Sequence, residues 1–351
     1  MAKRIGVAVI GGTGYGAAEL LRLLALHPEA EIVSVVSRSQ GGKAISSQHP
    51  HLRGFFDFNF EQEFDHRALQ AYEHKVVFTA LPHGVASDTI TKLYGTLSEN
   101  DIKLIDFSGD FRLQDPAQRS CHYPDSKAGE KVYASFVYGV PEINREKIAS
   151  AQFVSNPGCY ALTCILAAAP LAATSSSCII AFDGKSGSSG AGRSPQEAFH
   201  HPQSHANAWA YKILKHRHEP EIAQGLGDAQ GERIRISFVP HVIPTARGIY
   251  ATAHIRAEGF NESASELFSR YSEFYKNSKF VRVSTGAPEL NNVIGSNFCD
   301  LAVFENGDTI VALAVSDNLI KGMSGTAIQN MNLMCAIDET TGLWLPGLGI
   351  V

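Results

Sequence analysis

The chain has 351 residues, of which 44% are hydrophobic and 19% charged, and its formal net charge is −5. This length suits two globular domains better than one. A protein that binds double-stranded DNA normally carries a basic face, so the acidic balance predicts no nucleic-acid partner.

The sequence also predicts no membrane partner. No apolar run reaches the roughly 18 residues that a membrane-spanning helix needs. Arg4 leads directly into the apolar run Ile5–Ile10, without the charged, apolar and small-residue pattern of a signal peptide. We therefore expect a cytoplasmic protein.

The first 110 residues alternate short apolar runs with helical patterns. Ile5–Ile10 is followed by a leucine-rich helical stretch, 17–27, which Pro28 ends. Three more runs are rich in β-branched or aromatic residues: Ile32–Val36, Val76–Ala80 and Ile102–Phe107. Buried strands separated by helices predict a doubly wound parallel sheet of the Rossmann type.

The pattern changes after about residue 150. Longer strands with more alternation are expected at Cys178–Phe182, Arg233–Val239 and Ile249–Arg256, with a Gly/Ser-rich stretch and a His-rich stretch between them. These runs predict a second, α+β domain with a mixed or antiparallel sheet. A closing helix is expected over Thr326–Ile337.

A glycine-rich loop follows the first predicted strand. The loop Gly11–Ala17 can be read as G-x-G-x-x-A from Gly12 or as G-x-x-G-x-x-A from Gly11. Both readings are typical of a dinucleotide site, where the turn is tight and the pyrophosphate approaches the backbone. The next helix would present its N-terminal N–H groups to that phosphate. The second strand ends in Ser37-Arg38-Ser39 rather than in an acidic residue, which favours the 2′-phosphate of NADP over the ribose of NAD.

Among the six cysteines, Cys159 is the candidate nucleophile. Pro157 and Gly158 predict a turn directly before an apolar helical run, which puts Cys159 at or near a helix N-terminus. The helix dipole lowers the pKa of a thiol there. Cys164 and Cys178 lie inside apolar runs and are expected in the core.

A thiolate nucleophile needs an acid/base partner, and the segment His216-Arg217-His218-Glu219-Pro220 offers two histidines. Pro220 is typical of the first residue of a helix, so we expect His218 in the turn before it. The pattern alone does not choose between His216 and His218. The spacing of the histidines fits no established zinc pattern, so we expect no metal site.

Taken together, these motifs resemble the N-acetyl-γ-glutamyl-phosphate reductases of the semialdehyde dehydrogenase group. The resemblance covers essentially the whole chain, and the cysteine and histidine segments are its most specific parts. The matching segments are Gly11–Ala17, Ser37–Ser39, Ala80–Gly84, Asp106–Arg112, Tyr138–Glu142, Asn156–Tyr160, Lys185–Arg193, His216–Ile222, Pro240-His241 with Arg247-Gly248, and Asp317–Gly322.

This resemblance implies an NADP(H)-binding domain over residues 1–157, completed by 323–351, and a catalytic and oligomerisation domain over residues 158–322. It implies a homodimer or homotetramer. It also implies that Cys159 attacks an acyl phosphate, that phosphate leaves, that hydride from NADPH reduces the thioester, and that His218 acts as acid/base.

Further residue roles follow from the resemblance and the motifs. The residues expected at the cofactor are Gly11, Thr13, Gly14, Tyr15, Gly16, Ser37, Arg38, Ser39, Pro82, Gly158 and Asn318. The residues expected at the substrate are Arg112, Asn156, Lys185, His216, His241 and Arg247.

Two other functions compete with this one. The first is reduction of a related acyl phosphate, either the aminoadipyl phosphate of lysine biosynthesis or aspartyl phosphate. The second is a non-enzymatic NADP-binding sensor, which the presence of both Cys159 and His218 disfavours because a sensor needs no nucleophile.

Overall fold

The computed structural model describes residues 4–175, 177–228, 232–257 and 260–350. The chain forms two compact units. Unit 1 comprises Met1–Pro157 and Met323–Trp344, and unit 2 comprises Gly158–Gly322 together with the residues from Leu345 on.

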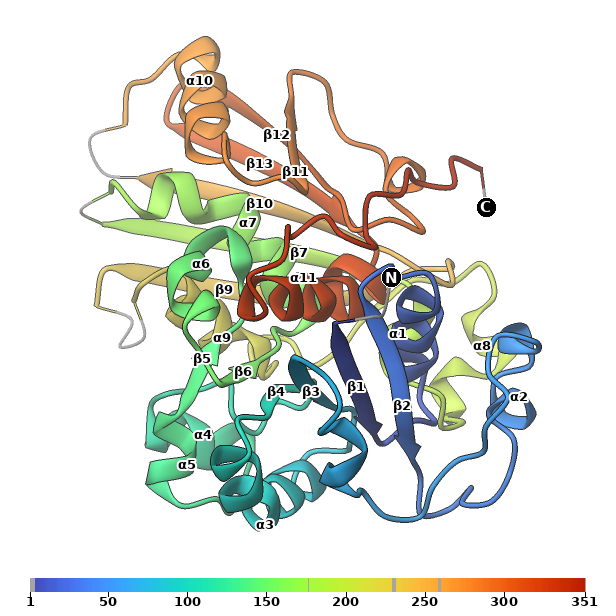
Figure 1. Ribbon diagram of the computed structural model, residues 1–351. Coiled ribbons are helices and arrows are strands. Elements are labelled where there is room, and N and C mark those ends of the chain that lie inside the picture. The colour runs from blue at the N-terminus through green and yellow to red at the C-terminus, as the bar shows by residue number, and fades with distance from the viewer. Residues whose placement is uncertain (1–3, 176, 229–231, 258–259, 351) are drawn as a thin grey trace. The chain divides into compact units, whose positions relative to one another are not determined.

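Unit 1 is built on a six-stranded sheet of order β2-β1-β3-β4-β6-β5, in which every neighbouring pair is parallel (Figure 1). The predicted Rossmann-type sheet is confirmed. Its strands are β1 (Ile5–Ile10), β2 (Ala30–Val36), β3 (His74–Thr79), β4 (Lys103–Asp106), β5 (Phe136–Tyr138) and β6 (Phe153–Ser155). Its helices are α1 (Tyr15–Ala25), α2 (Ile45–Gln48), α3 (Val85–Glu99), α4 (Pro116–His122), α5 (Glu130–Ala134), α6 (Pro141–Ala149) and α11 (Gly325–Met334).

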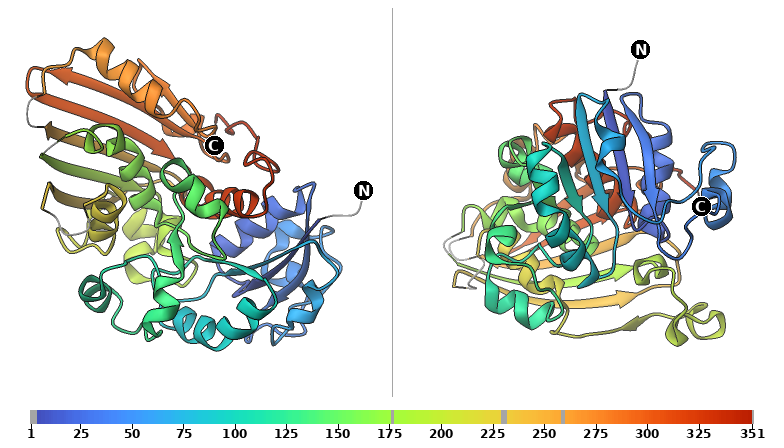
Figure 2. Two further views of the ribbon diagram at one scale, coloured as in Figure 1. Left: turned by 60° about the vertical axis from the view of Figure 1, so that its left-hand side comes forward. Right: turned by 60° about the horizontal axis from the view of Figure 1, so that its bottom comes forward.

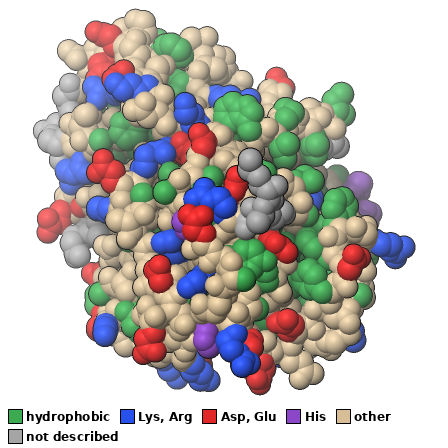
Figure 3. Space-filling model, viewed as in Figure 1, with side chains coloured by type: hydrophobic (Ala, Val, Ile, Leu, Met, Phe, Trp, Pro, Cys, Tyr) green, Lys and Arg blue, Asp and Glu red, His purple; other side chains and the backbone are tan. Residues whose placement is uncertain are grey.

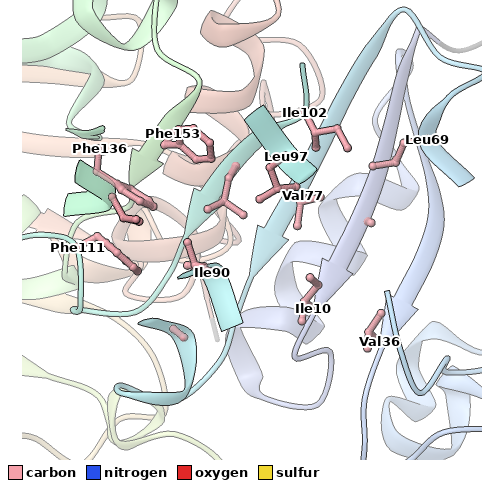
Figure 4. Close-up of a cluster of buried hydrophobic side chains, with 14 residues drawn as sticks. Ile10, Val36, Leu69, Val77, Ile90, Leu97, Ile102, Phe111, Phe136 and Phe153 are labelled. Carbon is pink, nitrogen blue, oxygen red and sulfur yellow. The ribbon is translucent and has the colours of Figure 1, made fainter. Parts of the chain in front are cut away.

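The strands of unit 1 are apolar because both faces of the sheet are covered. Figure 4 shows one covered face, where Ile90 and Leu97 of α3 pack with Ile10 and Val77 from the strands. The alternate strand residues, such as Val9, point to the other face, as the two-residue period of a strand requires.

Helix α11 belongs to unit 1, although more than 160 residues separate it from Pro157, where the first segment of that unit ends. It contacts α1, α6 and β4. Its buried amides bond to backbone and side-chain groups: Asn330 Nδ2 donates to Gly139 O at 3.0 Å, and Asn332 Oδ1 lies 3.1 Å from His27 Nε2. The residues from Leu345 on are grouped with unit 2 instead, where the Leu348 N–H donates to Ile294 O at 2.8 Å. The family resemblance implies that all of 323–351 completes the nucleotide-binding domain, whereas only Met323–Trp344 belongs to unit 1.

Unit 2 is built on a seven-stranded mixed sheet of order β11-β12-β13-β10-β7-β9-β8, in which β7 and β9 are parallel and β10 is antiparallel to both β7 and β13. The predicted α+β character is confirmed. The strands are β7 (Cys178–Ser186), β8 (Trp209–Ala210), β9 (Ile234–Val242), β10 (Ile249–Ala257), β11 (Val281–Ser284), β12 (Cys299–Asn306) and β13 (Thr309–Ser316). The helices are α7 (Cys159–Ala172), α8 (His201–Ser204), α9 (His218–Gly225) and α10 (Ala264–Phe274).

Helix α7 is the centre of unit 2, and it packs on β10, β13, α9 and α10 (Figures 1 and 2). Every residue from Tyr160 to Ala172 is buried. Pro170 lies inside this helix and has no N–H, so the Leu166 carbonyl loses its helical partner. The Tyr275 hydroxyl, just beyond α10, donates to that carbonyl at 2.6 Å and replaces the missing bond.

The surface carries charges of both signs. On the face shown in Figure 3, lysines and arginines are interspersed with acidic side chains. This distribution agrees with the small net charge of −5.

Tyr275→Phe should lower the free energy of unfolding by about 1–3 kcal/mol, because it leaves the buried Leu166 carbonyl without a donor. Tyr271→Phe is the matched control: the Tyr271 hydroxyl also donates to α7, to Ala167 O at 2.7 Å, but that carbonyl keeps its helical N–H. The control should cost less, about 0.5–1.5 kcal/mol. Urea unfolding of both variants measures the difference, and equal losses would contradict the role given to Pro170.

Candidate active site

A cavity of about 620 Å³ lies at the carboxyl ends of β1, β2 and β3 in unit 1. β1 lies between β2 and β3, so the chain passes from β1 to β2 on one side and then returns from β2 to β3 on the other side of β1. Dinucleotides bind at this kind of switch point in open parallel sheets.

The backbone at this switch point requires glycine. Gly11 has a φ of +96°, and a Cβ atom there would lie 2.5 Å from the Ala80 carbonyl oxygen. Its N–H donates to Val36 O at 3.0 Å, which ties the loop to the end of β2. Gly14 then caps α1 with extended backbone geometry. The loop therefore lets a ligand approach the backbone closely, as a pyrophosphate requires.

The structure brings many of the predicted cofactor residues to this cavity. Those lining it are Gly11, Thr13, Ser37, Arg38, Ser39 and Pro82. Gly14, Tyr15 and Gly16 are in the adjacent loop and the first turn of α1, while Gly158 and Asn318 belong to unit 2. The lining also includes residues that the sequence motifs did not single out, among them Gln62, Glu63, Thr89 and Lys92.

Cys159 is the first residue of α7, as the sequence predicted, and Gly158 is the capping residue. The Gly158 N–H donates to Glu221 Oε1 at 2.7 Å. Gly322 lies against Cys159: a Cβ at position 322 would be 2.7 Å from Cys159 Cβ. Close packing thus holds Cys159 at the positive end of the α7 dipole, which favours a thiolate.

A second cavity, of about 370 Å³, contains Cys159 and is lined by residues of unit 2. Its walls come from the start of α7, the end of β7 with the loop after it, the segment 196–199, the segment 209–218 and β9. The lining residues are Cys159, Tyr160, Ser186, Gly187, Gly190, Ala191, Gln196, Ala198, Phe199, Trp209, Tyr211, Lys212, His216, Arg217, His218 and Val242.

Both candidate histidines line this cavity, and both are buried. Their ring centroids lie 4.6 Å apart, and the His218 N–H donates to His216 Nδ1 at 3.2 Å. His218 is the first residue of α9 rather than part of the preceding turn, so the prediction that Pro220 begins the helix was wrong by two residues. Proline is tolerated anywhere in the first helical turn, where N–H groups have no helical acceptor.

Two tyrosines complete the pocket. The Tyr160 hydroxyl donates to His241 O at 2.7 Å, and burial raises the pKa of Tyr160 far above its usual value. Burial, followed by the neighbouring Cys159 thiolate, raises the pKa of Tyr211 to about 12. Both phenols therefore stay protonated near neutral pH and remain hydrogen-bond donors. Tyr211 has no motif signal of its own in a single sequence.

The other cysteines differ from Cys159 in exposure, since Cys159 is partly buried. Cys164, Cys178, Cys299 and Cys335 are buried, which confirms the core assignment of Cys164 and Cys178. Burial raises the pKa of Cys164 and Cys178, and it raises that of Cys335 to about 12. Cys121 is exposed and lies in unit 1.

Several predicted substrate residues lie outside the lining of the Cys159 cavity. Lys185 Nζ and His241 Nδ1 lie 3.1 and 2.8 Å from the Asp183 carboxylate. Arg247 Nε lies 3.0 Å from Asp317 Oδ2.

Three other predicted residues hold backbone groups. In unit 1, Arg112 is buried and its Nε donates to Asn156 O at 2.7 Å, while Asn156 Nδ2 donates to Met323 O at 2.9 Å. In unit 2, Asn318 Oδ1 accepts the Gly248 N–H at 2.7 Å.

Within the described residues, no group of three or more His, Cys, Asp and Glu side chains is arranged to hold a metal ion. The same residues include no helix that is long and apolar enough to cross a membrane.

Family models match both halves of the chain. Residues 6–151 match the NAD binding domain of semialdehyde dehydrogenases, and residues 159–318 match their dimerisation domain. The fold also resembles that of aspartate semialdehyde dehydrogenase II from Vibrio cholerae, with a TM-score of 0.70, 16% identity, and coverage of 95% of this chain and 99% of that one. The Candida albicans enzyme, solved with NADP, has a TM-score of 0.70 at 15% identity, with coverage of 96% and 99%.

The fold and the matched domains define an oxidoreductase of the semialdehyde dehydrogenase class with a nicotinamide-binding domain. Relatives named N-acetyl-gamma-glutamyl-phosphate reductase are 45% identical in Methanothrix thermoacetophila, covering 98% of this chain and 99% of the relative, and 43% identical in Archaeoglobus fulgidus, covering 97% and 99%. The chain belongs to the N-acetyl-gamma-glutamyl-phosphate reductase family.

Proposed function

We propose that this protein reduces N-acetyl-γ-glutamyl phosphate to N-acetyl-L-glutamate 5-semialdehyde with NADPH and releases phosphate, a step of arginine biosynthesis. The observation that carries the proposal is the pocket in which Cys159, at the start of α7, shares its walls with His216 and His218. The names of relatives that are 45% and 43% identical support the choice of substrate.

The chemistry needs a covalent step at Cys159. The thiolate attacks the γ-carbonyl carbon of the acyl phosphate, the bond to the phosphate oxygen breaks, and phosphate leaves with its electron pair. A thioester remains on the sulfur. NADPH, when bound, would supply the hydride for reduction of this thioester. Collapse of the thiohemiacetal on Cys159 then returns the thiolate and releases the aldehyde.

The start of α7 contributes more than the nucleophile. The first N–H groups of a helix have no acceptor within it, so those at the start of α7 can stabilise the negative oxygen that develops in both steps. The protonated Tyr211 also lines this pocket, and the Tyr160 hydroxyl beside it already donates to His241 O. We assign the proton transfer at the thiohemiacetal to His218, and we assign His216 to substrate binding.

The anionic substrate needs nearby cations. Among the described residues, Lys212 and Arg217 are the lysine and arginine that line the Cys159 cavity. Lys212 has a left-handed backbone, with a φ of +45°, in a region that residues other than glycine adopt rarely. We assign attraction of the substrate to Lys212 and Arg217 because they line the cavity that contains Cys159, whereas Lys185, His241 and Arg247 lie outside its lining.

We propose NADP rather than NAD as the physiological cofactor. The cavity at the end of β2 offers the Arg38 guanidinium and the Ser37 and Ser39 hydroxyls, and Lys92 of α3 adds a second cation. A 2′-phosphate accepts charge-assisted hydrogen bonds from such groups. Glu63 also lines the cavity, so the local balance of charge is two cations against one carboxylate among these residues.

Assembly into a homodimer or homotetramer through unit 2 is part of the proposal. The match of residues 159–318 to a dimerisation domain supports it. Ile179 on β7 and Phe304 on β12 are exposed apolar side chains of that unit, and they would be covered by a second copy.

An assay in the reverse direction tests the substrate. Purified protein is given phosphate, NADP and one of three aldehydes: N-acetylglutamate semialdehyde, aminoadipate semialdehyde or aspartate semialdehyde. The proposal expects kcat/KM to be highest for the first.

Cys159→Ser should lose at least about three decades in rate while NADPH binding persists, because serine lacks a thiolate. Near-normal turnover by this variant would exclude the thioester route. In the aldehyde assay, a higher kcat/KM for another aldehyde would show that the proposed substrate is wrong.

Arg38→Ala should weaken NADPH binding by roughly 1.5–3 kcal/mol and leave NADH binding nearly unchanged, because only NADPH has the phosphate that this guanidinium can bind. Binding is measured by nucleotide fluorescence titration. Arg53→Ala, an exposed arginine of unit 1 outside the cavity, is the control. Equal loss for both nucleotides would contradict the assignment of Arg38 to the 2′-phosphate.

His218→Asn should reduce kcat by about two to four decades and leave cofactor affinity unchanged, as expected for loss of a general acid/base. His216→Asn, which removes the neighbouring imidazole of the same pocket, should cost less and act mainly on KM. Steady-state kinetics of the two variants decides between the histidines. If His216→Asn lowers kcat more than His218→Asn does, His216 is the acid/base and His218 binds the substrate.

A further inference from the structure

The glycine-rich loop of unit 1 is held by a buried histidine that does not line the cofactor cavity. His49 directly follows α2 and is 1% exposed. Its Nε2 lies 2.7 Å from the Gly12 carbonyl oxygen. A carbonyl oxygen only accepts hydrogen bonds, so Nε2 carries the proton in this pair. The buried imidazole is therefore a donor to one backbone group of the loop.

The preceding residue makes the same kind of contact with the next peptide group of the loop. The Gln48 side-chain amide donates to Thr13 O at 3.2 Å. Close packing also restricts the loop, because a Cβ at Gly12 would lie 2.4 Å from Val35 Cγ1 and 3.1 Å from Phe60 Cε1. Two donors from one segment, together with the core, therefore fix consecutive peptide groups of the loop.

The carbonyl groups of the loop all accept hydrogen bonds from the protein itself. Gly11 O accepts the Thr13 N–H at 3.0 Å, and Gly14 O accepts the Ala18 N–H at 3.0 Å. The two side-chain bonds satisfy the carbonyls of residues 12 and 13. Within the described part of the chain, by contrast, the Gly14 N–H and the first N–H groups of α1 donate to no protein acceptor.

The direction of each loop carbonyl also sets the direction of the next N–H, because the two groups point to opposite sides of a trans peptide. Holding Thr13 O towards Gln48 turns the Gly14 N–H away from α2. Phosphate oxygens accept hydrogen bonds from N–H groups of this kind at the start of a helix. A loop carbonyl that turned towards the phosphate would repel it instead, so the two side chains keep the loop in the orientation that an anion requires.

We propose that His49 is a positioning residue of the cofactor site, which acts through the backbone of the glycine-rich loop, and that Gln48 assists it. This inference rests on the proposed binding of NADP at this loop. His49 fixes the Gly12 carbonyl on the side away from the pyrophosphate. A loop that is already ordered loses less freedom when the nucleotide binds, so the cofactor is bound more tightly.

Two fragments of the cofactor separate this role from that of Arg38. Adenosine 2′,5′-bisphosphate carries the 2′-phosphate and the 5′-phosphate at which the pyrophosphate begins, whereas 2′-AMP lacks the 5′-phosphate. His49→Phe keeps a planar ring in the core and removes the donor, and His49→Gln keeps a donor and serves as the rescue variant. His51→Phe removes an exposed imidazole from the same segment and is the matched control.

We expect His49→Phe to raise the Kd of the bisphosphate, of NADPH and of NADH about 5- to 20-fold, because all three place a 5′-linked phosphate on the loop. The Kd of 2′-AMP should change less than about twofold, since it has no such phosphate. Arg38→Ala should give the crossed pattern, with weaker binding of both fragments and unchanged binding of NADH. His49→Gln should stay within about threefold of the unmodified protein, and His51→Phe should match it. Calorimetric titration measures each Kd.

The melting temperature of each variant without nucleotide separates loss of the fold from loss of positioning. If His49→Phe does not fold, Gln48→Met decides, because it keeps the length of the side chain and removes the second donor. It should raise the same Kd values about 2- to 5-fold and leave that of 2′-AMP unchanged. If the folded variant weakens 2′-AMP as much as the bisphosphate, or weakens neither, these side chains have a structural role only.

Failure of the cofactor assignment would look different. If the unmodified protein binds NADH as tightly as NADPH, the choice of NADP is wrong, and the pair 5′-AMP and adenosine replaces the first two fragments. His49→Phe should then weaken 5′-AMP about 5- to 20-fold and leave adenosine unchanged. Equal effects on 5′-AMP and adenosine would contradict the positioning role of His49.

Discussion

The candidate site in unit 2 depends on the hydrogen bond from the Gly158 amide to Glu221, because this bond ties the start of α7 to α9. Cys159, the proposed nucleophile, is the next residue along α7, and His218 is the first residue of α9. Gly322 lies against Cys159 and leaves its backbone little room to move. The thiol of Cys159 and the imidazole of His218 come from segments almost 60 residues apart and are held in one geometry, which the proposed covalent catalysis requires.

Local patterns were enough to predict the parallel sheet of unit 1 and the position of Cys159. Continuous apolar runs such as Ile5–Ile10, separated by helices, are typical of strands that are buried on both faces of a parallel sheet. Pro157-Gly158 before an apolar run indicates that a helix begins directly after it. The strands β12 and β13 were not anticipated, and neither was the start of α9 at His218. Sequence signals for strand and helix ends are weak because tertiary contacts decide them.

The candidate site was harder to predict because it depends on non-local pairing. Lys185 and Arg247 are plausible anion binders in sequence, but Asp183 and Asp317 contact them in the fold. Tyr211 and Lys212 line the cavity although no motif marks them, because the loop that carries them is placed by strand β8 and its pairing with β9. A charge or a phenol becomes functional only through its neighbours, and those come from distant parts of the chain.

In α7, the Tyr275 hydroxyl replaces the N–H that Pro170 lacks, and this replacement affects the order in which the two residues can change during evolution. Pro170 and Tyr275 are more than 100 residues apart, yet the proline leaves the Leu166 carbonyl without a helical N–H, and the tyrosine hydroxyl donates to that carbonyl instead. If the proline were lost, the Leu166 carbonyl would regain a helical partner and the tyrosine would become dispensable. If the tyrosine were lost first, the carbonyl would be buried without a donor. Divergence at these two positions is therefore expected to follow an order, with changes at Pro170 preceding changes at Tyr275.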